Sequence, residues 1–240
     1  MIPQETLGTA RIPGQAGAIQ LCRHDRDFSI RVQGIELMTS REHGSEELLA
    51  ELALACLPST DNARVLVGGL GMGFTLARTL QLVGTAAQVE VVELVPEVIS
   101  WNREWLGELT GHPLSDRRVS ALAGDVLQRI RSANADYDAI LLDVDNGPVG
   151  LTRPANDRLY DRAGLAAAGI ALRPGGVLAI WSSTPHPQFA KRLRSAGYEA
   201  REERVRARLT RGPHRTIWIA TARRWGSRRR NQRGPSTPSG

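Results

Sequence analysis

The sequence predicts an α/β protein with a doubly wound, mostly parallel sheet of seven strands, preceded by a small N-terminal β-hairpin module. From Arg64 onward, strand-like and helix-like segments alternate, as they do where helical crossovers join parallel strands. The segment YDAILLDVD (137–145) contains a nearly continuous apolar run, which is typical of a strand covered on both faces. A cluster of glycines follows the first strand of this series, where such folds bind ligands.

The first 57 residues are predicted to form a separate hairpin and helix module. Residues 18–40 alternate apolar and polar side chains around a turn at 24–27, which indicates two or three antiparallel strands. A helix-period run follows, with Ser45 as its expected N-cap and Glu46 and Glu47 in its first turn. Pro58 marks the end of this module.

Residues 58–222 are predicted to form a nucleoside-binding, Rossmann-like catalytic domain. Its strands and helices alternate up to residue 197, and an antiparallel pair closes the sheet. The expected strands are 64–70, 88–94, 118–125, 137–145, 175–182, 198–207 and 215–223, and the expected helices are 73–83, 96–109, 126–133, 159–172 and 186–197.

The basic character of the chain belongs to its last 18 residues. Segment 223–240 carries six arginines and no acidic residue, which accounts for the whole formal net charge of +6. Its Gly, Pro and Ser content predicts a disordered tail, and the neutral remainder predicts no nucleic-acid partner. We also expect no membrane association and a cytoplasmic location, since no apolar run of about 18 residues and no signal-peptide pattern is present.

The glycine cluster predicts a nucleoside-binding loop. Gly69, Gly71 and Gly73 form G-x-G-x-G at a strand-to-helix turn, where backbone amides can face a ligand. Glu93 ends the next strand, at a place where a carboxylate can accept both hydroxyls of a ribose. A dinucleotide site would require a further glycine at Phe74, so the spacing favours adenosyl-sulfonium donors. A tight turn that binds nothing is the remaining alternative.

Residues at three other strand ends complete the predicted nucleoside pocket. Gly124 and Asp125 follow the third strand, where the carboxylate can meet an adenine edge, cap the next helix, or do both. Leu94 and Val126 are their neighbours on the predicted cofactor side, and Trp181 at the end of the fifth strand is a candidate pocket residue. No cysteine or histidine spacing predicts a metal site.

The end of the fourth strand carries the predicted catalytic carboxylate. Asp143 is expected to accept a proton from an amine nucleophile, with Asp145 as the second candidate. Asn146 is either a turn residue or a substrate-binding residue. Arg153 in the following loop would favour an anionic group if it faces the pocket, and otherwise it is a solvated surface charge.

These motifs resemble those of the spermidine synthase (polyamine aminopropyltransferase) family. The resemblance rests on GIELMTSREHGSEELLAEL, VLVGGLGMGFTL, VEVVELVPEVI, AGDV and YDAILLDVDNGPVG. It implies a class I methyltransferase-like fold, decarboxylated S-adenosylmethionine as the donor, and a small amine as the acceptor. It further implies that Glu93 holds the ribose, Asp125 the adenine amino group, and that Asp143 is catalytic. Members of that family commonly pair as homodimers, although no residue here requires it.

The chain departs from the family pattern where polycationic substrates are recognised. Gly71 stands where the family has an aspartate that helps hold the donor's ammonium, and the second aspartate of the fourth-strand motif falls at Asn146. Ser45 and Glu46 replace a Tyr-His pair. Three alternatives therefore stay open: an aminopropyltransferase of polyamine biosynthesis, a methyltransferase that uses intact S-adenosylmethionine, and a non-catalytic module that binds adenosyl nucleosides.

Overall fold

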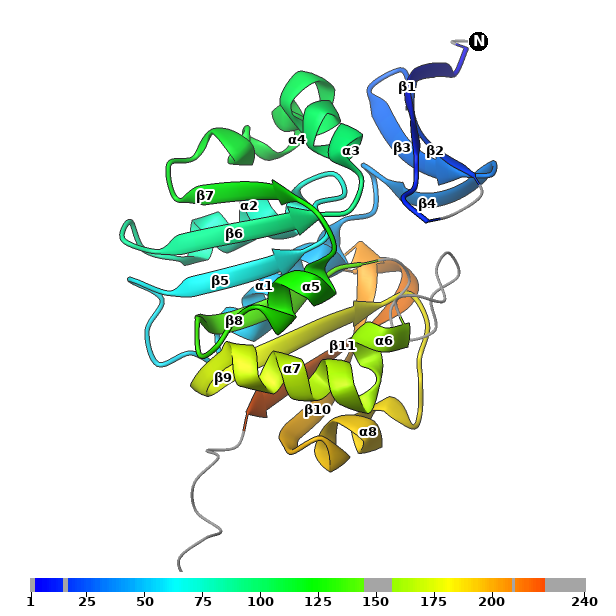
Figure 1. Ribbon diagram of the computed structural model, residues 1–240. Coiled ribbons are helices and arrows are strands. Elements are labelled where there is room, and N and C mark those ends of the chain that lie inside the picture. Colours follow the sequence, from blue (N-terminus) through cyan, green and yellow to red (C-terminus); the bar gives the residue numbers. More distant parts are fainter. Residues whose placement is uncertain (1–2, 15–16, 145–156, 209, 223–240) are drawn as a thin grey trace, which may run out of the picture.

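A four-stranded antiparallel sheet forms the N-terminal part of the computed structural model, which describes residues 3–14, 17–144, 157–208 and 210–222 (Figure 1). We call it the N-terminal sheet, and its strands, in spatial order, are β1 (Glu5–Arg11), β2 (Ala18–His24), β3 (Asp27–Val32) and β4 (Ile35–Thr39). Two or three strands were predicted within residues 18–40, and β2, β3 and β4 lie there. β1 was not predicted, because Gly8 and a register shift interrupt any apolar alternation in ETLGTAR.

A second sheet of seven strands, the central sheet, confirms the predicted fold class. Its spatial order is β10-β11-β9-β8-β5-β6-β7, and the pairs from β9 through β7 are parallel while β11 runs antiparallel to β9 and β10. The bounds are β5 (Arg64–Gly68), β6 (Gln88–Glu93), β7 (Val119–Ala123), β8 (Tyr137–Leu142), β9 (Leu172–Ser182), β10 (Tyr198–Arg208) and β11 (Arg211–Ala222). The chain runs from β5 to β6 and β7 on one side and from β8 to β9 on the other, which places the switch point between β5 and β8.

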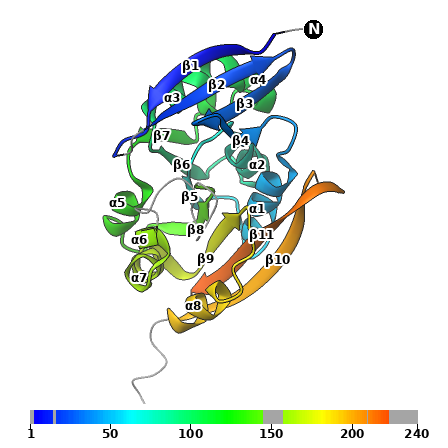
Figure 2. The ribbon, with the colours of Figure 1, turned by 90° about the vertical axis from the view of Figure 1, so that its right-hand side faces the viewer.

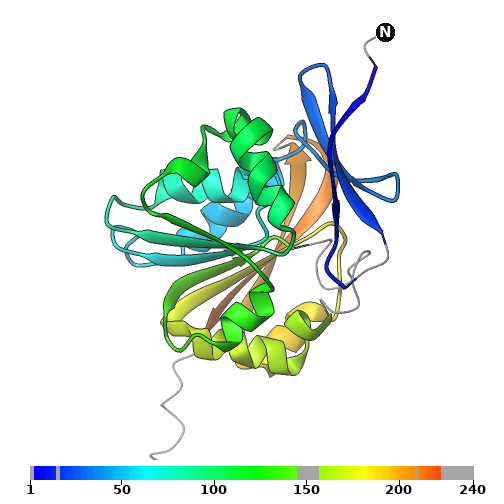
Figure 3. The same ribbon diagram turned by 45° about the horizontal axis from the view of Figure 1, so that its top comes forward.

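Helices cover both faces of the central sheet (Figures 1 and 3). One apolar core joins the sheet to α1 (Gly44–Leu54), α2 (Phe74–Leu82) and α3 (Pro96–Trp101), which continues through a π-helical turn (Asn102–Leu106) into α4 (Gly107–Thr110). The other core contains α5 (Val126–Arg131), α6 (Asp157–Tyr160), α7 (Arg162–Ala171) and α8 (Phe189–Ser195). No helix within the described ranges combines the length and apolar character needed to cross a membrane.

The N-terminal sheet shares the first of these cores and lies beside α3 and α4 (Figure 2). Gly8 of β1 packs directly on the indole of Trp101, because a Cβ atom at Gly8 would overlap its Nε1 atom. This contact has no room for a larger residue. It joins β1 of the N-terminal sheet to the end of α3, the helix that follows β6.

The start of α1 differs from the prediction. The helix begins at Gly44, the residue before it is His43, and no side chain caps it. Ser45 lies inside the first turn and its hydroxyl donates to Glu46 Oε2 at 2.6 Å, so the expected N-cap at Ser45 is wrong. The helix packs on α2 and β9 of the central sheet. The domain boundary after residue 57 stays a prediction, and the predicted tail 223–240 lies outside the described residues.

Candidate active site

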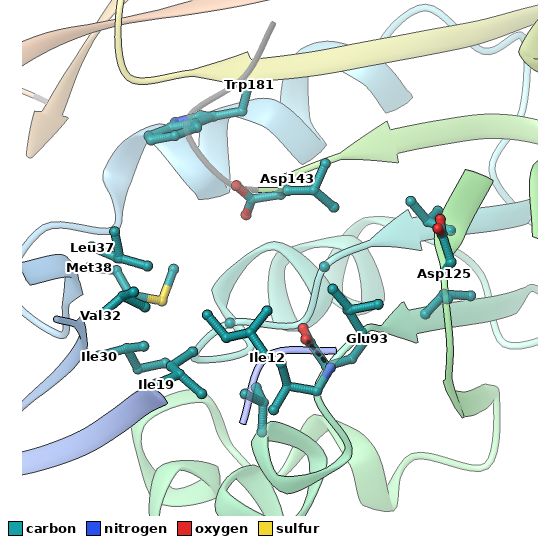
Figure 4. A pocket seen from close by; sticks show the side chains of 18 of the residues that line it. Ile12, Ile19, Ile30, Val32, Leu37, Met38, Glu93, Asp125, Asp143 and Trp181 are labelled. Carbon is teal, nitrogen blue, oxygen red and sulfur yellow. Dashed lines mark hydrogen bonds between the residues drawn. The ribbon is translucent and has the colours of Figure 1, made fainter. Parts of the chain in front are cut away.

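A cavity of about 160 Å³ opens at the switch point, between the carboxyl ends of the central strands and the N-terminal sheet (Figure 4). The strands β5 to β8 each contribute a residue at or just after their ends: Gly69, Glu93, Gly124 and Asp143. The opposite wall is apolar and comes from the N-terminal part of the chain: Ile12, Ile19, Ile30, Val32, Leu37 and Met38. The cavity therefore has a polar side and an apolar side.

The glycine loop follows β5 with a backbone that requires glycine. Gly69, Gly71 and Gly73 all have positive φ angles, of 83°, 50° and 87°. A Cβ atom at Gly69 would overlap the carbonyl oxygen of Asp143, so the loop passes tightly across the end of β8. Gly69 and Gly71 line the cavity, whereas Gly73 begins α2 and packs against Asn102.

Glu93 connects the glycine loop to the cavity. Its Oε2 accepts the Leu70 amide and its Oε1 accepts the Val95 amide, each at 2.9 Å. Burial raises the pKa of Glu93, and these backbone amides partly oppose the shift. The Gly71 and Leu94 amides also stabilise the ionised carboxylate. A carboxylate has about four acceptor positions, so a ligand hydroxyl can compete for a hydrogen bond to Glu93.

Asp125 lies at the other end of the cavity from the N-terminal sheet (Figure 4). Its Oδ1 accepts the Leu127 amide at 2.8 Å, so it caps α5. Gly124 and Val126 beside it line the cavity, as does Leu94 after β6. In this one conformation Asp125 caps α5 and lines the cavity, so capping the helix is compatible with meeting an adenine edge.

Asp143 follows β8 and lies near Trp181 on the upper side of the cavity in Figure 4. Its Oδ2 accepts the hydroxyl of Thr75 at 2.6 Å. Removal from water raises the pKa of Asp143 to about 6, the Thr75 hydrogen bond opposes this shift, and the charge of Glu93 adds to it. The other predicted residues of this region, Asp145, Asn146 and Arg153, lie outside the described residues.

Glu46 is a cavity residue that the sequence-based list of candidates omitted. It lies in the first turn of α1 and is only 7% exposed. Burial, followed by the charge of Asp143, raises its pKa to about 8. A signal was present in the sequence, because Glu46 is in helical phase with Leu49, Ala50 and Ala53 on the buried face of α1.

Met38 is the second omitted residue, and it lies against the glycine loop. A Cβ atom at Gly71 would be 2.8 Å from Met38 Cε and 3.1 Å from its Sδ. The thioether therefore fills the space beside Gly71 into which a larger side chain at that position would extend. No sequence signal predicts this contact, since Met38 comes from β4 of the other sheet.

The described cavity lining combines four carboxylates with apolar side chains and includes no basic residue. The four acids are Glu46, Glu93, Asp125 and Asp143. Among the described residues, no three His, Cys, Asp or Glu side chains gather closely enough to hold a metal ion. Such a lining can hold a ligand that is partly apolar and positively charged, and its carboxylates can accept protons.

Comparison with known sequences identifies related proteins. Residues 42–193, more than half of the chain, match the family described as the spermine/spermidine synthase domain. Putrescine N-methyltransferase 2 of Nicotiana tabacum is 35% identical over 133 residues, which cover 55% of this chain and 35% of that protein. A polyamine aminopropyltransferase of Mycobacterium tuberculosis (strain ATCC 25618 / H37Rv) is 30% identical over 175 residues, covering 69% of this chain and 32% of that protein. The matches thus span about a third of each curated relative.

A solved structure shows the same fold. Spermidine synthase from Thermotoga maritima matches with a TM-score of 0.72 at 18% sequence identity, over 90% of this chain and 72% of that chain. At that identity the likeness concerns the fold, and it confirms the class I methyltransferase-like sheet with its small N-terminal sheet.

Proposed function

The chain belongs to the family of the spermine/spermidine synthase domain, and we propose that it transfers an aminopropyl group from decarboxylated S-adenosylmethionine to a small amine. One observation carries the proposal: Glu93 behind the glycine loop and Asp143 at the end of β8 face the same cavity. The carboxylate of Glu93 can accept hydrogen bonds from the hydroxyls of a ribose, and that of Asp143 can accept a proton from an amine. The proposal that the transferred group is aminopropyl is supported by the relative named polyamine aminopropyltransferase.

The proposed reaction is an in-line displacement at carbon. The amine nitrogen forms a bond to the propyl carbon, the bond from that carbon to sulfur breaks, and its electron pair stays on sulfur, which leaves methylthioadenosine. Asp143 accepts the proton that the nitrogen loses. Glu93 and Asp125 would hold the sugar and the adenine, so the protein supplies mainly alignment and a site shielded from water.

Methyl transfer from intact S-adenosylmethionine is the second candidate, and a specific contact favours it. Met38 fills the space beside Gly71, where the family resemblance implies an aspartate for the donor's ammonium. The relative in Nicotiana tabacum is a putrescine N-methyltransferase. In this case the methyl carbon forms the new bond to nitrogen, and S-adenosylhomocysteine is the other product.

The test offers the full chain both donors with a panel of mono- and diamines, and identifies products by mass. Aminopropylated amine and methylthioadenosine support the first function, whereas methylated amine and S-adenosylhomocysteine support the second. Calorimetry with methylthioadenosine tests the nucleoside site separately, with NAD as the control ligand. Glu93→Gln should weaken methylthioadenosine binding at least about tenfold, because a buried charge-assisted bond is lost. Absence of both turnover and nucleoside binding would contradict the proposal.

This proposal implies that the protein binds a small amine as its acceptor substrate. The homodimer and the cytoplasmic location stay predictions, of which the first can be measured by sedimentation of the purified chain.

A further inference from the structure

The cavity carries negative charge that no described lining residue balances. Burial and the charge of Asp143 raise the pKa of Glu46, and burial and the charge of Glu93 raise the pKa of Asp143. Neither Glu46 nor Asp143 forms an ion pair with a basic side chain of the described residues. The cation that acts on Glu46 from β11 is Arg215, which lies 5.8 Å from the ring centre of Trp181 and 3.9 Å from Glu42. A buried pair of carboxylates in this situation is stabilised by a cation that enters with a ligand.

A fixed hydrogen-bond chain orients Glu46 toward the cavity. The indole Nε1 of Trp181 donates to Ser45 Oγ at 3.0 Å, and the Ser45 hydroxyl donates to Glu46 Oε2 at 2.6 Å. The Glu46 side chain is more than nine-tenths buried and lines the cavity, and the Ser45 hydroxyl, its own backbone amide and the charge of Arg215 each favour its ionised form. A cation that enters the cavity with a ligand can stabilise that form further.

The surroundings of Glu46 and Asp143 restrict the ligand further. Trp181 and Met38 line the same cavity, and the wall beyond Met38 is apolar (Figure 4). Among the described residues, no group of three or more His, Cys, Asp or Glu side chains could hold a metal ion. An alkylammonium can place its charge on the two carboxylates and its carbon chain on the apolar wall.

We propose that Glu46, together with Asp143, binds an ammonium group carried on an aliphatic chain. Glu46 thereby supplies from α1 the carboxylate that the glycine loop lacks at Gly71. This inference rests on the proposed function of the cavity. The ammonium group has two sources in that reaction, the aminopropyl tail of the donor and the amine of the acceptor.

The test compares Glu46→Gln with Glu47→Gln in the full-length protein. Glu47 is the neighbouring residue of α1, but its carboxylate contacts His43 at 2.8 Å and does not line the cavity. Calorimetry measures the affinity for decarboxylated S-adenosylmethionine, for methylthioadenosine, and for a panel of alkylamines in the presence of methylthioadenosine. Methylthioadenosine contains the nucleoside without an ammonium group, so it reports on the proposed nucleoside site alone.

We expect Glu46→Gln to weaken binding of an ammonium ligand at least about tenfold while methylthioadenosine affinity is unchanged. A loss confined to decarboxylated S-adenosylmethionine assigns the ammonium to the donor, and a loss confined to alkylamines assigns it to the acceptor. Glu47→Gln should bind all ligands as the unsubstituted protein does. Unchanged affinity of Glu46→Gln for every ammonium ligand would overturn the inference, whereas failure of methylthioadenosine to bind any variant would contradict the proposed function instead.

A second measurement needs no variant. An ammonium ligand competes with the proton on Glu46. The affinity for decarboxylated S-adenosylmethionine or an alkylamine should therefore increase as pH rises toward about 8. The charged and polar groups around Glu46 are Asp143 from β8, Arg215 from β11 and Ser45 from its own helix. An affinity for these ammonium ligands that does not change as pH rises toward about 8 would also overturn the inference.

Discussion

Asp143 and Glu46 have raised pKa values because both carboxylates have left water and each lies in the field of another acid. Their situations still differ. Thr75 donates to Asp143 and stabilises its ionised form, which keeps its pKa at about 6. Near neutral pH the protein therefore presents an ionised Asp143 that can take a proton, beside a Glu46 that is protonated until a cation arrives.

The ionisation of Asp143 should determine how the activity falls on the acidic side of its pH profile. An ionised base is required, so kcat should fall as pH drops through about 6, where Asp143 becomes protonated. Asp143→Asn should abolish turnover and leave methylthioadenosine binding intact, as measured by initial rates and calorimetry. Asp136→Asn, at a half-buried position just before the opposite end of β8, is the matched control. Full activity of Asp143→Asn would exclude this residue from the mechanism.

Glu46 should make folding stability depend on pH. Its pKa is about 8 in the folded protein against an ordinary 4.5, so its ionisation costs stability as pH rises through that interval. Glu46→Gln cannot ionise, and its melting temperature should exceed that of the unsubstituted protein above pH 8, by roughly 2–4 °C for each kcal/mol regained. Below pH 4.5 the difference should vanish. Thermal unfolding at several pH values checks this, and a gain that is equal at all pH values, or shared by Glu47→Gln, would contradict it.

At the scale of elements, alternating strands and helices could be predicted because each buries a distinct apolar pattern. Parallel strands bring their carboxyl ends to one edge of the sheet, so Glu93 and Asp143 could be predicted from the sequence to lie close together, and both line the cavity. The start of α1 was misassigned because Ser45 is a common capping residue type, whereas here its hydroxyl bonds to Glu46 inside the first turn. β1 was missed because Gly8 lacks the side chain that an alternating pattern needs.

The contact between β4 and the glycine loop could not be predicted, since it joins a strand of the N-terminal sheet to a loop more than thirty residues further along the chain. It gives a test of packing. Gly71→Asp should cost about 1–3 kcal/mol of stability, because its Cβ atom would crowd Met38, and Met38→Ala should recover part of that cost. Asp tolerates the positive φ of 50° at this position better than most residues, so the clash dominates.

Thermal unfolding of the two single variants and the double variant measures this coupling. Strictly additive effects would show that Met38 and residue 71 do not share space.

At the scale of the whole molecule, the site depends on how the two sheets are held together. Gly8→Val should push β1 away from Trp101 and displace the apolar wall of the cavity. The nucleoside end near Asp125 lies on the far side (Figure 4), so methylthioadenosine affinity should change little while the KM for the amine rises. Thr9→Val places the same residue type at the neighbouring, exposed position of the strand, where it meets no indole, and is the control. If Gly8→Val weakened methylthioadenosine binding as much as it raised the KM for the amine, the two ends of the cavity would not be independent.

The shared cavity between two independently hydrogen-bonded sheets has a consequence for how this protein can diversify. The apolar wall of the cavity comes from the first forty residues, whereas Glu93 and Asp125 come from the part of the chain that forms the central sheet. Under the proposed function, substitutions in the first forty residues would alter the volume and polarity offered to an incoming nucleophile. Grafting that segment between relatives, with Met38 kept in its contact with Gly71, is therefore a direct route to redesigned specificity.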